Sequence, residues 1–453
     1  MMIFLYKIIL NILFVLFLPC LPFVCFFSEK RRATLGLRFG FSTGLTPKQP
    51  GKKRLWIHAL SVGEVISAVP FVRALKEHRI GLDIVFTAST KTGFDMANQL
   101  FLKDNTRLPD QSAEQLVDQL GYFPFDLGYC VKKISRQINP DAVVIVETDL
   151  WPNFLYEMKK NKIPVMLINA RLSKRSLKGY LLFKNFSSMF FSSLIVIMAQ
   201  TPLDKKRFQR LGIDEKKILV AGNIKFDQPF EDMDERGLDA MRDRFGIQKN
   251  TQVLVAGSTH DGEEKLLCNI YKKSKKNFPG LLMILAPRDT KRCSAIKSYF
   301  LSREVHTVFL STLDSLKEMD NPEKMNDTRD CPDVVLVDKM GELSRLYAIC
   351  DVAFVGGSMV RQGGHNPLEA AAFSKPVLFG PDMSDFLMIS TLMMDHGGAK
   401  MVESEQNLGK EIEILLKDKQ IRQQMGRRNF EIFSQNSGAV QRIIQQMECL
   451  DIV

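Results

Sequence analysis

Residues 356–370 read Gly-Gly-Ser-Met-Val-Arg-Gln-Gly-Gly-His-Asn-Pro-Leu-Glu-Ala and carry the clearest structural signature of the chain. They follow a short apolar run that is typical of a buried strand, and they lead into a helical pattern. Asn366 suits the helix N-cap and Pro367 suits the first helical turn. The two Gly-Gly pairs allow a close approach of the backbone, and free amides at a helix start favour an anion such as a phosphate. A simple capped turn would explain the same residues, but a strand, a glycine loop and a capped helix in this order favour a nucleotide site.

On both sides of this motif, short apolar runs alternate with amphipathic stretches from residue 54 onward. This alternation predicts an α/β fold with doubly wound parallel sheets. The predicted strands are Leu55–Leu60, Asp83–Thr87, Ala142–Val146, Val165–Asn169, Ile195–Ala199, Val253–Ala256, Leu281–Ala286, Val334–Val337, Val352–Val355 and Pro376–Phe379. The charged, turn-rich residues 226–246 interrupt the alternation. We therefore expect two Rossmann-like domains, over residues 29–227 and 228–453.

The first residues of the chain, 1–28, are predicted to form a membrane anchor. The run Ile8–Phe27 contains one clearly polar side chain, Asn11, and a run of about 20 apolar residues matches the hydrocarbon core of a bilayer. A basic cluster at residues 30–32 follows it, so the positive-inside rule puts the body of the protein in the cytoplasm. A cleaved signal peptide and a buried core helix are the alternatives. The length of the run and the lack of a small-residue cleavage site favour an uncleaved anchor helix.

The formal net charge of +11 is compatible with a nucleic acid, an anionic membrane or an anionic substrate as partner. The sequence contains no zinc finger, no RNA-recognition signature and no ribbon of alternating basic and aromatic residues, so we expect no nucleic-acid binding. Its eight cysteines include no C-x-x-C pair, which gives no support to a zinc ribbon or a thioredoxin-like site.

The segment Gly-Gly-His-Asn-Pro-Leu-Glu at residues 363–369 resembles the donor motif of the 3-deoxy-D-manno-octulosonic acid (Kdo) transferases. Other segments resemble that family in the same order along the chain: Ser61–Val65, Glu147–Asn153, Asn169–Ser173, Gly222–Asp227, Ala256–His260, Ala286–Arg288 and Met340–Leu343. The resemblance implies the GT-B architecture, in which two Rossmann-like domains face a cleft. It also implies an inverting enzyme of lipopolysaccharide core biosynthesis at the cytoplasmic face of the inner membrane. CMP-Kdo would be the donor, bound by the C-terminal domain, and a lipid A precursor (lipid IVA) would be the acceptor, bound by the N-terminal domain.

For catalysis, the resemblance implies that Glu64 is the general base, which removes the proton of the attacking acceptor hydroxyl. Glu64 follows a predicted strand, at the sheet edge where open α/β sheets bind ligands. A helix-start glutamate that complements the helix dipole is the alternative reading. The resemblance further implies that Glu147 and Lys225 support the transition state, although a polar strand end and a solvated lysine would explain them too. Asp149 stands where the family usually has a glutamate, so it keeps a carboxylate with a shorter reach.

For the donor, the resemblance implies a CMP site built from three segments. Its residues are Pro287, Arg288, Met340, Gly341, Glu342, Asn366, Pro367, Leu368 and Glu369. An arginine can hold a phosphate or the cytosine edge through several donors, and a helix-start glutamate can accept hydrogen bonds from ribose hydroxyls. Asp289 replaces the histidine that usually follows in the family. No Asp-x-Asp motif stands in a suitable loop, so we expect no metal and no other cofactor, and EDTA should leave transfer intact.

The sequence leaves two other classes of function and the role of one surface open. Another nucleotide-sugar enzyme, such as a related glycosyltransferase or a UDP-sugar epimerase, would share the fold, but an epimerase would not need an apolar amino terminus. A membrane-tethered polyanion-binding protein would not need the candidate base and the donor loops. Residues 176–195 mix phenylalanines with lysines. They would form either an apolar and basic face that meets the inner-membrane lipids or a core helix with a solvated edge.

Overall fold

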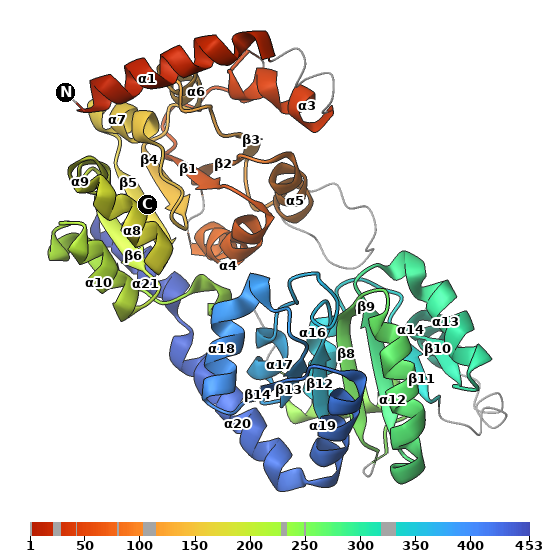
Figure 1. Ribbon diagram of the computed structural model, residues 1–453. Coiled ribbons are helices and arrows are strands. Elements are labelled where there is room, and N and C mark those ends of the chain that lie inside the picture. Colours follow the sequence, from red (N-terminus) through yellow and green to blue (C-terminus); the bar gives the residue numbers. More distant parts are fainter. Residues whose placement is uncertain are drawn as a thin grey trace. The chain divides into compact units, whose positions relative to one another are not determined.

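The structure, a computed structural model, describes residues 2–20, 29–41, 43–78, 81–102, 115–227, 233–248, 251–318 and 332–453. The chain divides into two compact units (Figure 1). Unit 1 comprises Met1–Gln228 and Asn436–Val453, and unit 2 comprises Pro229–Gln435. Each unit has a parallel sheet with helices around it, which confirms the prediction of two parallel-sheet α/β domains. Residues 436–453 belong to unit 1, however, so the expected second domain over residues 228–453 is too long at its carboxyl end.

The sheet of unit 1 has seven parallel strands in the order β3-β2-β1-β4-β5-β6-β7. The strands are β1 Arg54–Ala59, β2 Asp83–Ala88, β3 Gln119–Tyr122, β4 Ala142–Val146, β5 Val165–Ala170, β6 Val196–Ala199 and β7 Ile218–Val220. Every residue of β1, β2, β4, β5 and β6 is buried, as expected for a parallel sheet that is covered on both faces. The strand order reverses between β1 and β4, and ligands of open α/β sheets bind at the carboxyl ends of the strands at such a switch point.

Helices cover both faces of this sheet. They are α3 Glu29–Arg38, α4 Val62–His78, α5 Lys91–Phe101, α6 Gly128–Ile138, α7 Pro152–Lys160, α8 Lys174–Leu182, α9 Lys184–Phe191, α10 Pro202–Arg210 and α21 Ala439–Cys449. Alternate residues of β1 contribute to opposite faces: Ile57 packs in the cluster that contains α4 and α21, and Trp56 packs in the cluster that contains α6 and α7. The helix α21 buries Ile443 and Met447 in the first cluster, which is why the carboxyl terminus belongs to unit 1.

The amino-terminal segment forms α1 Met2–Phe17 and a 3-10 turn, η1 Leu18–Cys20. In the described part of the chain, no helix is long and apolar enough to cross a membrane. The predicted anchor helix over residues 8–27 is therefore not supported, and its residues 21–27 lie outside the described ranges. The α-helix ends at Phe17, shortly before Pro19, which has no amide hydrogen to continue the α-helical hydrogen bonds. The Tyr6 hydroxyl donates a hydrogen bond to Asp126 of unit 1 at 2.9 Å, so α1 packs on that unit.

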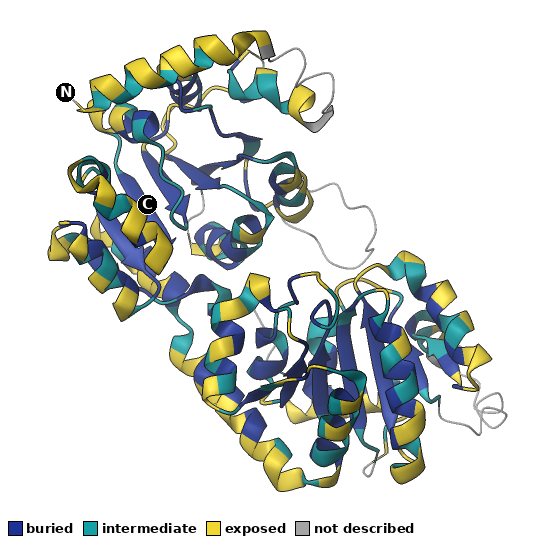
Figure 2. Ribbon diagram, in the orientation of Figure 1, coloured by how far each residue is buried: buried dark blue, intermediate teal, exposed yellow. Residues whose placement is uncertain are grey.

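The sheet of unit 2 also has seven parallel strands, in the order β10-β11-β9-β8-β12-β13-β14. The strands are β8 Val253–Thr259, β9 Leu282–Pro287, β10 Thr307–Phe309, β11 Val334–Leu336, β12 Val352–Val355, β13 Val377–Phe379 and β14 Ala399–Met401. The helices are α11 Glu235–Arg244, α12 Glu263–Asn277, α13 Cys293–Ser302, α14 Leu310–Glu318, α16 Leu343–Leu346, α17 Leu368–Ala372, α18 Leu387–Asp395, α19 Glu405–Lys417 and α20 Lys419–Asn436. The strand order reverses between β8 and β12, and Figure 2 shows the buried strands of both sheets between helices with exposed outer faces.

Candidate functional site

The switch point of unit 1 carries a polar pocket, which we call the carboxylate pocket. It measures about 340 Å³ and is lined by Glu64, Glu147, Thr148, Arg171, Leu172, Ser173, Ser176 and Tyr180. Glu64 lies in the first turn of α4, which follows β1, and Glu147 directly follows β4. The two predicted glutamates therefore meet in one pocket, because their strands are neighbours in the sheet.

The carboxylate of Glu64 is held by the backbone of the turn that precedes it. Its Oε2 accepts hydrogen bonds from the amides of Leu60 and Ser61, the latter at 3.1 Å. Burial raises the pKa of Glu64 to about 7, the nearby carboxylates of Glu147 and Asp149 act in the same direction, and the two backbone bonds oppose them. A carboxyl group with a pKa near 7 can accept a proton from a hydroxyl at neutral pH, which is the requirement for a general base.

Glu147 is a second buried carboxyl group with an unusual backbone. Its φ is +60°, a left-handed conformation that is uncommon for residues other than glycine. Burial raises the pKa of the Glu147 carboxyl, and the positive charges of Lys225 and Arg171 oppose this shift. Lys225 lies in η3 Ile224–Asp227 of the same unit. All three residues that were predicted for catalysis therefore lie near one another at this end of the sheet.

Asp149 belongs to a partly buried hydrogen-bond network. Its Oδ2 accepts a hydrogen bond from Trp151 Nε1 at 3.0 Å and lies 3.2 Å from His58 Nε2. His58 is fully buried and stacks on Phe123, with 3.8 Å between the ring centroids. The Asp149 carboxylate is thus bonded to Trp151 and lies beside His58. It affects the pKa of Glu64 only as a nearby negative charge. The sequence analysis did not single out His58. The only hint in the sequence is that a histidine interrupts the otherwise apolar run Leu55–Leu60.

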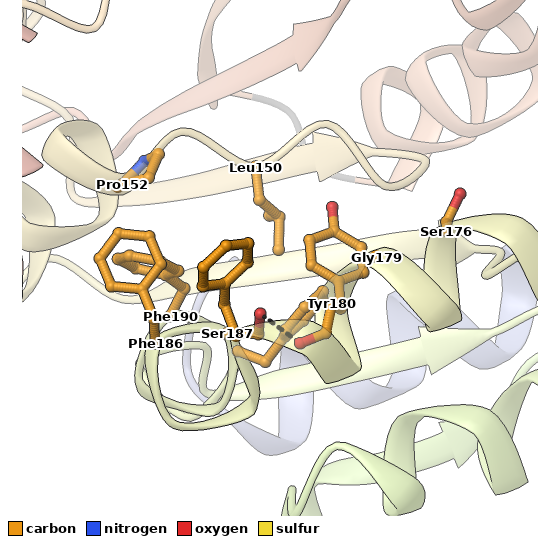
Figure 3. Close-up of a pocket in the computed structure, with 10 residues that line it drawn as sticks. Leu150, Pro152, Ser176, Gly179, Tyr180, Phe186, Ser187 and Phe190 are labelled. Atoms are coloured by element: carbon orange, nitrogen blue, oxygen red, sulfur yellow. Dashed lines mark hydrogen bonds between the residues drawn. The ribbon is translucent and has the colours of Figure 1, made fainter.

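An apolar pocket adjoins the carboxylate pocket, and Figure 3 shows its lining. It measures about 460 Å³ and is lined by Leu150, Pro152, Ser176, Gly179, Tyr180, Phe183, Phe186, Ser187, Phe190 and Phe191. Ser176 and Tyr180 line both pockets. Of the phenylalanines in residues 176–195, Phe191 is buried at 1% exposed and Phe183 is 70% exposed, so a core helix alone does not account for all of them.

In unit 2, the predicted CMP residues gather at the carboxyl ends of β9 and β12. Arg288 is exposed directly after β9. Burial raises the pKa of Glu369 to about 7, opposed by the charge of Arg288 and by a hydrogen bond with Asn366, so these three side chains lie within electrostatic reach of one another. The helix begins one residue later than predicted, with Pro367 as N-cap, but Asn366 Oδ1 still accepts a hydrogen bond from the Leu368 amide at 3.1 Å.

The other predicted CMP residues are placed by the strands that precede them. Pro287 is the buried last residue of β9. The turn with Met340 and Gly341 follows β11, which pairs with β9, so it lies at the same sheet edge. Glu342 forms an ion pair with Arg244 at 2.9 Å, and Met340 is 58% exposed. At this turn the backbone and Met340 are accessible to a ligand, while the Glu342 carboxylate is engaged.

The first half of the glycine loop has a structural partner that the sequence did not reveal. The carboxylate of Glu263, which is fully buried, accepts hydrogen bonds from the amides of Gly357, Ser358 and Met359 at 2.8, 3.1 and 2.9 Å. It also accepts one from the amide of His260 at 2.9 Å. In the first Gly-Gly pair, the Gly357 amide therefore binds a side chain of the protein, and the Gly356 amide donates to the Gly257 carbonyl at 2.8 Å.

A histidine pair completes this end of unit 2. His260 Nε2 lies 2.8 Å from His365 Nε2, and the rings stack with 5.1 Å between their centroids. Gly357 makes room for the pair, because a Cβ there would lie 2.9 Å from the His365 ring. Burial and the positive charges of Arg288 and His260 lower the pKa of His365 to about 4. His365 is therefore neutral at pH 7, and one ring donates to the other.

Among the described residues, no group of three or more histidine, cysteine, aspartate or glutamate side chains is arranged to hold a metal ion. Metal independence stays a prediction for the EDTA experiment.

Two parallel sheets with polar and charged side chains at the carboxyl ends of their strands are typical of α/β enzymes that bind a nucleotide. The particular family follows from the sequence relatives. The family model described as 3-Deoxy-D-manno-octulosonic-acid transferase (kdotransferase) matches residues 33–228. The 3-deoxy-D-manno-octulosonic acid transferase of Haemophilus influenzae is 32% identical over 441 residues, which are 96% of each chain. The chain belongs to the Kdo transferase family, as the resemblance of its motifs implied, and is a glycosyltransferase.

Two further proteins are similar to this chain. The 3-deoxy-D-manno-octulosonic acid transferase of Chlamydophila psittaci is 29% identical over 91% of this chain and 88% of its own. The crystal structure of the C-terminal CMP-Kdo binding domain of WaaA from Acinetobacter baumannii is 23% identical, covers 44% of this chain and 96% of that domain, and has a TM-score of 0.38. Family membership rests on the sequence relatives alone.

Proposed function

We propose that the protein transfers Kdo from CMP-Kdo to the lipid A precursor lipid IVA, with inversion at the anomeric carbon and with Glu64 as general base. The observation that carries the proposal is the position of Glu64. Its carboxylate is fixed by two backbone amides at the rim of a pocket at the switch point, and its pKa is about 7. The relatives that are named as Kdo transferases supply the identity of the sugar.

In the proposed reaction, an acceptor hydroxyl lies in the carboxylate pocket. Its oxygen attacks the anomeric carbon of Kdo, Glu64 takes the hydroxyl proton, and the bond from that carbon to the phosphate oxygen breaks. CMP leaves with the electron pair of the broken bond. Attack from the face opposite to the leaving group inverts the anomeric centre. Lys225 and Arg171 offset the negative charge of Glu147 beside the reacting groups.

For the donor, we propose that unit 2 binds CMP with Pro287, Arg288, Met340, Gly341, Glu342, Asn366, Pro367, Leu368 and Glu369. Arg288 would hold the phosphate, because a guanidinium binds phosphate oxygens through charge-assisted hydrogen bonds. The carboxyl group of Glu369 would contact the ribose hydroxyls. During catalysis the nucleotide must meet the acceptor at Glu64, and the GT-B architecture implied by the family would allow this.

We also propose that the protein works at the cytoplasmic face of the inner membrane and contacts the bilayer through α1. The apolar side chains of Phe4, Leu13 and Leu16 on α1 are 66%, 55% and 68% exposed. Such a helix can lie in the interface of a bilayer. Flotation of the full-length protein with liposomes that contain anionic lipid tests this. We expect it to float, and a Phe4→Ser, Leu13→Ser, Leu16→Ser variant to float much less. If both proteins floated equally, α1 would not be part of the surface that contacts the membrane.

The test of the activity is direct. Purified protein is incubated with CMP-Kdo and a tetraacylated disaccharide lipid, and the products are analysed by mass spectrometry. We expect a lipid whose mass has increased by a Kdo residue, together with free CMP. The same protein is incubated with UDP-N-acetylglucosamine. An epimerised UDP-sugar without any Kdo-lipid would overturn the proposal in favour of the epimerase alternative.

A further inference from the structure

The apolar pocket of unit 1 is a built cavity between α8, α9 and the segment that leads into α7 (Figure 3). Aromatic contacts hold its walls: Tyr180 meets Phe191 edge-on with 5.2 Å between centroids, and Phe186 meets Phe190 edge-on at 4.2 Å. The Ser187 hydroxyl donates to the Tyr180 carbonyl at 3.0 Å, so this polar group is satisfied within the protein. The lining is therefore suited to an apolar ligand.

The two pockets are arranged along one helix. Ser176 and Tyr180, which line both, are four residues apart on α8 and so lie on the same face of it. A ligand that lies along this face would meet carboxylates at one end and aromatic side chains at the other. It would need a polar part with hydroxyl groups joined to an apolar tail, as in an acylated sugar.

The surface around the apolar pocket combines exposed apolar and basic side chains, as in a protein surface that contacts lipid. Leu182 and Phe183, at the end of α8, are 80% and 70% exposed. Lys174, Arg175 and Lys178, also on α8, are exposed and would complement an anionic head group. Tyr6 of α1 contacts Phe186 of the lining, with 5.7 Å between centroids, so the apolar helix α1 borders the pocket.

We propose that the apolar pocket binds one acyl chain of the acceptor lipid while the sugar of the same molecule occupies the carboxylate pocket. The proposal rests on the proposed transfer to a lipid acceptor and adds a subsite that recognises the tail. An acyl chain in the pocket buries methylene groups, and it orients the sugar hydroxyl toward Glu64 because α8 joins the two pockets.

Gly179 offers a sharp test of this subsite. It lines the pocket, and a Cβ built on it has no atom within 4 Å, so a side chain can enter the space without a clash at its first atom. Leucine also favours the helical conformation more than glycine does. The Gly179→Leu variant should therefore fold and partly fill the pocket. Gly36→Leu is the matched control, because Gly36 is also helical, in α3, and its Cβ position is equally open.

The experiment measures KM and kcat with two acceptors in the same detergent: the tetraacylated disaccharide and the same disaccharide without its acyl chains. We expect Gly179→Leu to raise KM for the acylated acceptor by about tenfold or more, which corresponds to about 1.4 kcal/mol. The KM for the deacylated acceptor should be unchanged, and Gly36→Leu should behave like the wild type with both. Equal KM values of the wild type and Gly179→Leu for the acylated acceptor would overturn the acyl-chain subsite.

A direct binding measurement separates this proposal from the proposed reaction. The acylated disaccharide is titrated into the wild type, Gly179→Leu and Gly36→Leu without donor. If the wild type binds the lipid, Gly179→Leu binds it tenfold more weakly and no transfer is detected, the subsite stands and the proposed reaction falls. If transfer occurs but both variants bind the lipid like the wild type, the reaction stands and the subsite falls.

Discussion

Glu64 in unit 1 and Glu263 in unit 2 occupy corresponding places in similar sheets. Each lies in the first turn of the helix that follows the strand at the switch point, β1 in one unit and β8 in the other. Glu263 is fully buried and accepts hydrogen bonds from four backbone amides, three of them in the loop after β12. Glu64 accepts two, both from its own turn, and lines a pocket beside Glu147.

This difference shows that a glutamate at the start of the helix after the switch-point strand is not suited to be a general base by its position alone. The amides around Glu263 satisfy its carboxylate within the protein and tie a loop to the sheet. Burial raises the pKa of both carboxyl groups, but four backbone amides oppose this at Glu263, whereas only two oppose it at Glu64 and the charges of Glu147 and Asp149 add to the rise there. The same residue type thus holds a loop in one unit and is available for proton transfer in the other.

The largest expected effect is the loss of turnover when Glu64 is changed. In Glu64→Gln, kcat for Kdo transfer should fall by about 10²–10⁴-fold, the usual contribution of a general base. Titration calorimetry should show unchanged CMP affinity, because the nucleotide residues are in unit 2. Glu77→Gln, an exposed position on the same helix, is the control and should keep the wild-type rate. A Glu64→Gln variant with a wild-type rate would remove Glu64 from the chemistry.

The converse variant in unit 2 should affect binding first. Arg288→Ala removes a group that can form charge-assisted hydrogen bonds to phosphate, which contribute about 1.5–3 kcal/mol. We expect CMP to bind about 10- to 100-fold more weakly, as measured by titration calorimetry. Arg303→Ala, another exposed arginine of unit 2, should bind CMP like the wild type. Unchanged CMP affinity in Arg288→Ala would show that the nucleotide binds elsewhere.

A smaller effect tests the structural role of Glu263. Glu263→Gln keeps the shape of the side chain but turns one acceptor oxygen into a donor against buried amides, which costs about 1–3 kcal/mol. Chemical denaturation should show this loss of unfolding free energy, and the exposed control Glu403→Gln should show none. If Glu263→Gln were as stable as the control, the loop after β12 would not depend on this carboxylate.

The smallest expected effect is a gain in stability from Glu64→Gln. The pKa of Glu64 in the folded protein is raised to about 7 from its ordinary value of 4.5, so its contribution to stability is complete below about pH 4.5 and is lost as the pH rises through 7. A neutral glutamine does not suffer this loss. At pH 8 the variant should therefore be more stable than the wild type by on the order of 1 kcal/mol, since one pKa unit corresponds to about 1.4 kcal/mol. If the difference in unfolding free energy between Glu64→Gln and the wild type were the same at pH 8 as at pH 5, the raised pKa of Glu64 would be contradicted.

Much of the fold could be predicted from the sequence because central parallel strands are buried apolar runs. The strands that the alternation missed are β3, β7, β10 and β14, which lie at the four edges of the two sheets. They are short and partly exposed, so their apolar signal is weak. The helix α21 was assigned to the wrong unit because an amphipathic pattern predicts a helix and not the sheet on which it packs.

For the site, the sequence and the family resemblance predicted Glu64, Glu147, Lys225 and Arg288 as candidates, but not the hydrogen-bond networks that lie near them. His58 and Asp149 are 91 positions apart, and Glu263 and Gly357 are 94 apart. Such pairs form only when the strands come together, and no local pattern announces them. The apolar pocket was hidden for the same reason, because its lining comes from α8, α9 and the segment before α7.

The central claim is that the environment of Glu64 makes it the base, and the pH dependence of kcat tests this most directly. We expect kcat of the wild type to rise with pH through a midpoint near 7, because Glu64 must be deprotonated to accept the hydroxyl proton. The residual activity of Glu64→Gln should lack this rise. A wild-type rate that is constant from pH 5 to pH 8, or the same midpoint in Glu64→Gln, would contradict the assignment.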